Sequence, residues 1–326
     1  MKDLKRVLMV VFVIAGLSFI SGTANAGVEW GHTPHGHFAN NATNLNAFGL
    51  PAFDGNYIIY TAKAGIIDPD HVWGSGRKTF AAYKSAYSAL MDGKSEFTSN
   101  GIKARNITYP SGWASMSDEQ KKSIAQELAL KLGKTIGFHC EIYHELQTFW
   151  GGGIDYESSF SCEDLYSDAL GAELAMQAQK MENEGNGKAT SNITPLANQF
   201  MKDNGAVSAK RAKEVSDSLK GTFWRSRMIQ KAHMVRHLDI GVDGFVDNTA
   251  IPNFTPDRMS MTRLEAPLMD YSNVDGFSME LVVSSGKQLG KAKKRLDVKE
   301  IRILDHPRLM QIVKQDCIKK KYTVVD

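Results

Sequence analysis

The sequence predicts an α+β protein, a helix-rich single globular domain with a small sheet that follows a cleaved signal peptide. Helical patterns of apolar residues dominate the middle of the chain, from about residue 118 to residue 219. Short runs rich in β-branched residues lie on both sides of that region, and an apolar leader begins the chain. We therefore divide the chain into a signal peptide (1–26), an extended N-terminal arm (27–56) and one α+β domain (57–326).

The first 26 residues have the three parts of a secretory signal peptide. Lys2, Lys5 and Arg6 form a positive start, residues 7–20 are apolar, and Ala24-Asn25-Ala26 supplies the small side chains of a cleavage site. The apolar run is shorter than the roughly 20 residues that span a bilayer. We expect an exported protein, periplasmic or secreted, with no stable membrane span after cleavage.

The charge balance indicates no polyanionic partner. The chain carries a formal charge of +3, and removal of residues 1–26, with three basic residues and one acidic, leaves +1. We therefore expect no nucleic-acid partner, and we interpret the basic run at 287–295 as a solvated surface. Three cysteines are too few for a disulfide-built scaffold. If two of them pair, Cys140 with Cys162 is favoured, because they lie on consecutive predicted helices.

Residues 27–56 are rich in Gly, Asn, Pro and His, which is typical of an extended arm. The longest helix of the domain is predicted from Ser117, which with Gln120 has the form of a capping box, to Trp150, where a run of three glycines ends it. The other predicted helices cover residues 78–90, 161–179, 194–203 and 207–219, and the predicted strands cover residues 57–61, 279–284 and 300–304.

The most informative segment is the end of that long helix. At 100° per residue, Glu141, His144, Glu145 and Thr148 share one face, while large apolar residues gather on the other. One imidazole and two carboxylates on a single face suit a divalent cation or general acid and base catalysis. The alternative is an ordinary amphipathic helix whose polar face meets water. The zincin motif is excluded, because Thr148 stands where it needs a second histidine.

Further acidic groups could complete such a site. Asp68 and His71 lie in a predicted turn at Pro69, and their alternative role is an Asx turn. Asp164 lies at a predicted helix start, where Ser161 as the N-cap with an acid in the first turn is a sufficient explanation. Residues 239–247 place three aspartates in a loop that contains glycine, as a calcium site does, but without the full EF-hand pattern.

Four motifs together resemble a known family. They are Ile67-Asp68 with His71, the run at 144–151, the run at 159–167 with Gly171, and the run at 236–246. Their order and spacing resemble the bacterial family of domain of unknown function 4056, over about residues 60–255. The resemblance implies an envelope or secreted protein whose polar motifs form one shared site, and it implies no particular reaction.

We therefore expect the polar motifs to meet in one cleft of an exported, metal-assisted hydrolase that acts on an envelope or extracellular substrate. Glu145 is the expected base and Asp164 a catalytic residue or third ligand. The cofactor is expected to be a divalent ion, zinc, manganese or calcium. The expected metal ligands are Asp68, His71, Glu141 and His144.

Two other functions fit the same residues. One is a non-enzymatic envelope protein, for binding or structure, in which the acids and histidines form a buried hydrogen-bonded network. The other is a metal-free enzyme in which Glu145 and Asp164 divide the acid and base roles. The functions differ in whether a ligand can reach these acids and histidines.

Overall fold

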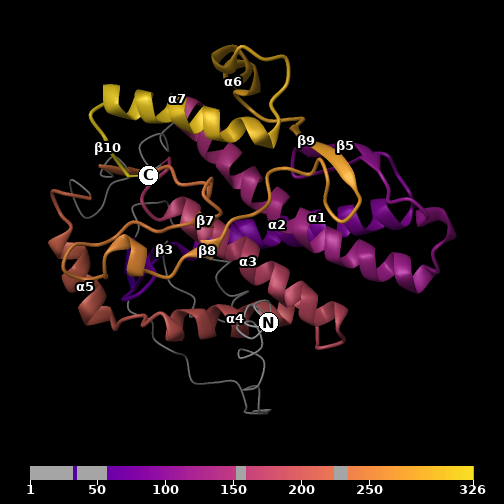
Figure 1. The fold of residues 1–326 in the computed structure, drawn as a ribbon. Helices are drawn as coiled ribbons and strands as arrows, with labels where there is room; N and C mark the ends of the chain where they lie inside the picture. Colours follow the sequence, from indigo (N-terminus) through magenta and orange to yellow (C-terminus); the bar gives the residue numbers. More distant parts are fainter. Residues whose placement is uncertain (1–31, 35–56, 152–158, 224–233, 326) are drawn as a thin grey trace, which may run out of the picture.

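A computed structural model describes residues 32–34, 57–151, 159–223 and 234–325 of the chain (Figure 1). The predicted signal peptide and all of the predicted arm except residues 32–34 lie outside these described residues. Within them the fold is α+β and rich in helix, as predicted. The helices are α1 (Pro69–Met91), α2 (Asp118–Gly151), α3 (Asp164–Asn183), α4 (Ala189–Asp203), α5 (Ala209–Ser218), α6 (Leu289–Leu296) and α7 (His306–Lys319).

The described strands form four small sheets rather than one. Two are antiparallel and three-stranded, with the orders β1-β2-β3 and β4-β5-β9. Two are strand pairs, the antiparallel β7-β8 and the parallel β6-β10, which brings the end of the chain back beside residues 235–237. The strands are β1 (His32–Pro34), β2 (Tyr57–Thr61), β3 (Gly65–Ile67), β4 (Phe97–Ser99), β5 (Ile102–Thr108), β6 (Val235–His237), β7 (Phe245–Val246), β8 (Leu264–Glu265), β9 (Ser278–Val283) and β10 (Thr323–Val325).

Helices α1, α2 and α3 form the centre of the molecule and approach one another at glycines. A Cβ atom at Gly171 of α3 would lie 2.1 Å from the carbonyl oxygen of Val72 in α1. A Cβ at Gly137 of α2 would lie 2.1 Å from Oγ1 of Thr79, also in α1. Because no side chain fits at either crossing, the backbones can pack closely. This contact holds the start of α1 beside the start of α3 and the end of α2.

Several elements differ from the sequence prediction, and helices α6 and α7 were not predicted. Helix α1 begins at Pro69 rather than at residue 78, because Asp68 accepts a hydrogen bond from the N–H of Asp70 (2.7 Å) and proline is favourable in a first helical turn. The strand predicted at 300–304 is wrong. Only one isolated bridge forms there, between Arg302 and Val282, and a 3₁₀ turn, η7 (Ile303–Asp305), follows.

All three cysteines are free thiols, so the pairing favoured for Cys140 and Cys162 is wrong. Each of the two thiols has its own acceptor. Cys140 donates to the carbonyl oxygen of Asn100 at 3.2 Å, and Cys162 donates to Oε2 of Glu163 at 3.0 Å.

Candidate functional site

The first turn of α1 presents His71 to the interior of the three-helix centre. Asp68 is buried just before it and is used structurally, because its carboxylate caps the helix and its N–H donates to Oγ of Ser167 at 2.9 Å. The His71 side chain keeps 22% of its surface exposed. The histidine is therefore held firmly and is still reachable from solvent.

The loop before α3 places Asp164 in a dense set of hydrogen bonds. Its Oδ2 accepts from the N–H of Ser161 at 2.7 Å, and its Oδ1 accepts from the Ser161 hydroxyl at 2.8 Å. The same hydroxyl lies 2.9 Å from Oε1 of Glu163. The expected cap is thus reversed, because the acid accepts from the backbone of the serine instead of the serine capping the helix. The first turn of α3 also favours a negative charge through the helix dipole.

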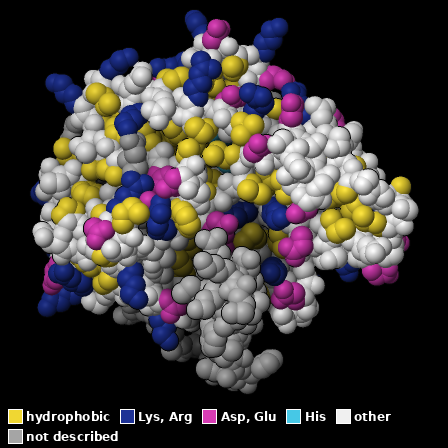
Figure 2. Space-filling model, viewed as in Figure 1, with side chains coloured by type: hydrophobic (Ala, Val, Ile, Leu, Met, Phe, Trp, Pro, Cys, Tyr) yellow, Lys and Arg dark blue, Asp and Glu magenta, His cyan; other side chains and the backbone are white. Residues whose placement is uncertain are grey.

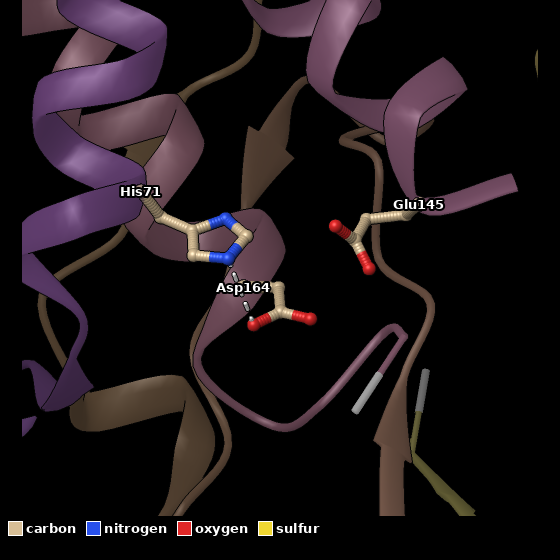
Figure 3. Close-up of side chains that lie close together, drawn as sticks. All are labelled: His71, Glu145 and Asp164. Carbon is tan, nitrogen blue, oxygen red and sulfur yellow. Dashed lines mark ion pairs between the residues drawn. The ribbon is translucent and has the colours of Figure 1, made fainter. Parts of the chain in front are cut away.

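Three side chains meet at this point (Figure 3). His71, Glu145 and Asp164 each offer one possible metal-ligand atom, and these atoms all lie within 4.8 Å of one another. Nε2 of His71 is 3.5 Å from Oδ1 of Asp164. Oε2 of Glu145, near the end of α2, accepts from the N–H of Phe160 at 2.8 Å. We call these three residues the cluster; they come from three different helices, and two of them are buried.

Asp168 contacts the His71 imidazole on the side opposite Asp164. Its Oδ1 lies 3.1 Å from Nδ1 of His71, so the imidazole stands between Asp168 on one nitrogen and Asp164 on the other. The Asp168 side chain is fully buried, and its Oδ2 has no hydrogen-bond partner among the described residues. A carboxylate on Nδ1 fixes the tautomer in which Nε2 is free to bind a metal. Asp168 was not predicted from the sequence, although it lies four residues after Asp164 and therefore on the same helix face.

Burial and mutual repulsion make the carboxylates hard to ionise together. Burial is the main reason that the pKa of Asp164 lies well above its usual range, while the nearby imidazole opposes the rise. Burial likewise raises the pKa of Asp168 to about 7, although His71 lowers it. For His71, burial lowers the pKa, but the combined attraction of Asp168 and Asp164 outweighs burial and raises the pKa well above 6.5.

The surroundings add more negative charge than positive. Six carboxylates that act on one another or on His71 are buried here, against the three cations His71, Lys78 and Arg236. Full ionisation of these nine groups, all in the described part of the chain, would therefore leave them with a net charge of −3. The six are Asp68, Glu141, Glu145, Glu163, Asp164 and Asp168.

The other predicted ligands lie outside the cluster. Glu141 is buried and forms an ion pair with Lys78 of α1 at 2.5 Å. His144 is the one exposed residue of the segment 135–150. The expected grouping of His144 with Glu145 and His71 is therefore corrected. Adjacent side chains point about 100° apart on a helix. Tertiary packing covers the side of α2 that carries Glu145 and leaves the His144 side chain in solvent.

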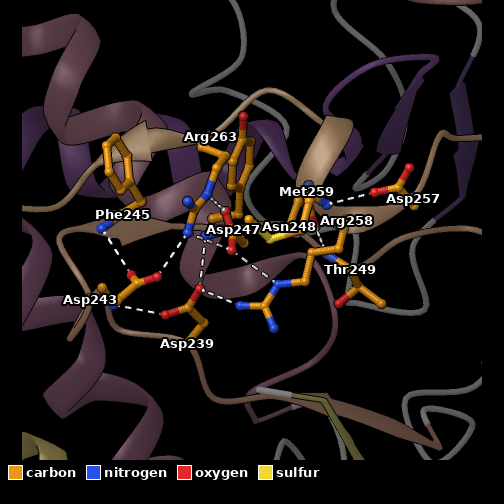
Figure 4. Close-up of polar contacts among 12 residues, drawn as sticks. Asp239, Asp243, Phe245, Asp247, Asn248, Thr249, Asp257, Arg258, Met259 and Arg263 are labelled. Carbon is orange, nitrogen blue, oxygen red and sulfur yellow. Dashed lines mark hydrogen bonds and ion pairs between the residues drawn. The ribbon is translucent and has the colours of Figure 1, made fainter.

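The acidic loop at 239–247 is neutralised by arginines (Figure 4). Arg258 binds both Asp239 and Asp247, each at 3.0 Å. Arg263 binds Asp247 at 2.5 Å and Asp243 at 2.9 Å. Two guanidinium groups thus take the place that a calcium ion would fill in such a loop.

The family model described as a protein of unknown function (DUF4056) matches residues 28–245. The chain belongs to this family. The match includes all three members of the cluster and Asp168, so the whole site lies inside the DUF4056 region. Comparison with curated proteins and with solved structures gave no match. Among the described residues, no helix is both long and apolar enough to cross a membrane.

Proposed function

We propose that this DUF4056 protein binds a divalent metal ion at His71, Glu145 and Asp164 and uses it to hydrolyse its substrate. The observation that carries the proposal is the convergence of one imidazole and two carboxylates, with ligand atoms within 4.8 Å of one another, in a buried region of surplus negative charge. Two carboxylates at that separation repel by about 3.5 kcal/mol at an effective dielectric near 20. A bound cation relieves this repulsion.

The donor set favours zinc or manganese over calcium. Calcium prefers six to eight oxygen ligands, whereas an imidazole with two carboxylates suits transition metals. Three protein ligands leave at least one coordination position for water, as in catalytic zinc sites, where the metal lowers the pKa of the water and makes it a nucleophile. In this arrangement Glu145 acts as a ligand rather than as the base expected from the sequence, because His144 is exposed.

The proposed substrate belongs to the cell envelope or the extracellular space. This part of the proposal rests on the signal-peptide pattern of residues 1–26, which implies export. His71, which is partly exposed, marks the side from which a substrate reaches the cluster.

A structural network is the second candidate, and one observation favours it. Glu145 and Asp164 already accept hydrogen bonds from Phe160 and Ser161, so they are not bare carboxylates. Protonation of Asp164 would also relieve the repulsion without a metal. In that case the site would hold its geometry without a metal and would catalyse nothing.

Activity assays of variants at the adjacent residues Glu145 and His144 distinguish the metal-assisted hydrolase from the structural network. Chromogenic carboxylic esters, phosphate esters and amides are tested with metal-free protein and with protein loaded with zinc or manganese. We expect hydrolysis only by the loaded protein, loss of it in Glu145→Gln and retention in His144→Gln. Equal activity with and without metal, or an active Glu145→Gln variant, would contradict the proposed role.

A further inference from the structure

The C-terminal part of the chain is far more basic than the remainder. Residues 287–326 contain twelve Lys and Arg against five Asp and Glu, a net charge of +7. Because the whole chain carries +3, residues 1–286 carry −4. This basic part begins after the DUF4056 match ends at residue 245. The small net charge of the whole chain is therefore the sum of an acidic part and a basic part.

Helices α6 and α7 carry these charges along one side of the fold. Arg295 of α6 binds Asp316 of α7, with Nη2 and Oδ1 2.8 Å apart. Lys291 donates to the carbonyl oxygen of Trp150, the penultimate residue of α2, at 2.9 Å. These two cations are used to fix α6 against its neighbours. The helices lie together at the top of Figure 1, where Figure 2 shows many Lys and Arg side chains.

Other lysines on these helices or in the residues next to them are exposed to solvent. They form no ion pair or side-chain hydrogen bond with the described residues. Asp316 lies one helical turn before Lys319, so the contact with Arg295 brings the end of α7 and α6 to the same place. We call the following set the basic edge: Lys287, Lys294, Lys299, Lys319 and Lys321.

An exposed aliphatic side chain accompanies the charges. Ile318 lies beside Lys319 at the end of α7, and 60% of its surface is exposed. An aliphatic group among lysines can enter the interface of a bilayer while the ammonium groups contact phosphates. The exposed Arg308 lies in the first turn of α7, away from the end of that helix, so the basic edge holds lysines. Lysines act as mobile point charges and do not form the planar fork with which arginine recognises a single phosphate. This chemistry fits an extended anionic surface better than one specific anion.

We propose that the basic edge docks the protein onto a membrane surface of anionic phospholipids. Attraction of the basic edge and repulsion of the acidic remainder orient the molecule, with α6 and the end of α7 toward the lipid. Docking is independent of the proposed metal site, which lies among α1, α2 and α3.

Vesicle cosedimentation of the full chain tests the proposal. Vesicles of phosphatidylcholine alone are compared with vesicles that contain about one third phosphatidylglycerol, at low and at high salt. We expect binding to the anionic vesicles at low salt, little binding to the neutral ones, and release by salt. Similar binding to both kinds of vesicle, or binding to neither, would overturn the proposal.

Two triple variants with the same change in net charge locate the contact. The first is Lys294→Gln, Lys319→Gln and Lys321→Gln on the basic edge. Each lysine near an anionic bilayer strengthens partitioning about fivefold, so we expect a loss of about a hundredfold. The matched control replaces three exposed lysines on α1, α2 and α4, which form no ion pairs, and should bind almost as the parent does. The control changes are Lys84→Gln, Lys122→Gln and Lys202→Gln.

Residues 1–26 are basic and apolar, but they are present in all variants. A difference in binding between the two triple variants therefore does not come from them. Equal losses in both triple variants would show a response to net charge alone and would overturn the proposal. Ile318→Ser is expected to weaken binding to the anionic vesicles at low salt without any change in net charge, because it removes the exposed aliphatic group. Binding to duplex DNA with none to anionic vesicles would assign the basic edge to nucleic acid and would also overturn the proposal.

Discussion

Acidification should destabilise the fold through a buried pair of histidines. Nδ1 of His139 in α2 lies 2.9 Å from Nδ1 of His306 at the start of α7, and both side chains are fully buried. One ring donates to the other, so the accepting ring must be neutral, and full burial disfavours a charge on the donating ring as well. Burial lowers the pKa of His306 to about 4, although Asp305 opposes the change. Burial, helped by His306, lowers the pKa of His139 well below 6.5.

The sign and size of the effect follow from these pKa values. A histidine with a depressed pKa in the folded state binds fewer protons than in the unfolded state, so its contribution is intact above about pH 6.5 and is lost as the pH falls. For His306, with values of about 4 folded and about 6.5 unfolded, the loss at about pH 5 is about 2 kcal/mol. His139 adds to this loss.

Carboxyl groups with raised pKa values act in the opposite direction, so a difference between two proteins is needed. Asp168, with a pKa of about 7, binds protons more tightly in the folded state and stabilises it as the pH falls below 7. This contribution is the same in the parent and in His306→Gln. Urea unfolding of both proteins at about pH 7 and about pH 5 should show a smaller loss in the variant, by about 2 kcal/mol. Equal losses would refute the assigned role of the imidazole pair.

Two further predictions concern the helix crossing and the support behind the cluster. Gly171→Ala should destabilise the protein by about 3 kcal/mol, because its Cβ would meet the carbonyl oxygen of Val72. Gly290→Ala in α6 is the control and should be neutral or slightly stabilising, because no atom lies near its Cβ. Thermal unfolding measures both changes in stability. Asp168→Asn should weaken zinc binding about 10- to 100-fold in calorimetric titration while the circular dichroism spectrum is retained, because the amide supports His71 less strongly; unchanged affinity would remove Asp168 from the site.

Local patterns predicted a large part of the candidate site. His71, Glu145 and Asp164 were all predicted as site residues, and the structure brings them together. Each lies at or near a helix end, where capping residues and glycines leave a recognisable pattern. The family resemblance implied that four motifs share one site; three of them supply the cluster, whereas the acids of the fourth bind Arg258 and Arg263. Asp168 was missed, although its spacing from Asp164 was visible in the sequence.

Other features depend on tertiary packing that a local pattern does not contain. His144 and Glu145 are equally polar, and only the position of α1 and α3 against α2 decides that Glu145 is buried and His144 exposed. The acidic loop resembled a calcium site because Arg258 and Arg263, which neutralise it, lie beyond the motif. The arrangement of the short strands into four separate sheets also depends on long-range pairing, such as that of β10 with β6.

The most direct test of the proposed centre is the metal content of four purified proteins after reconstitution with zinc or manganese. The parent chain and His144→Ala should each hold about one equivalent, and His71→Ala and Asp164→Asn should hold almost none while their circular dichroism spectra stay unchanged. No bound metal in the parent would contradict the account, as would loss of metal in His144→Ala with retention in His71→Ala.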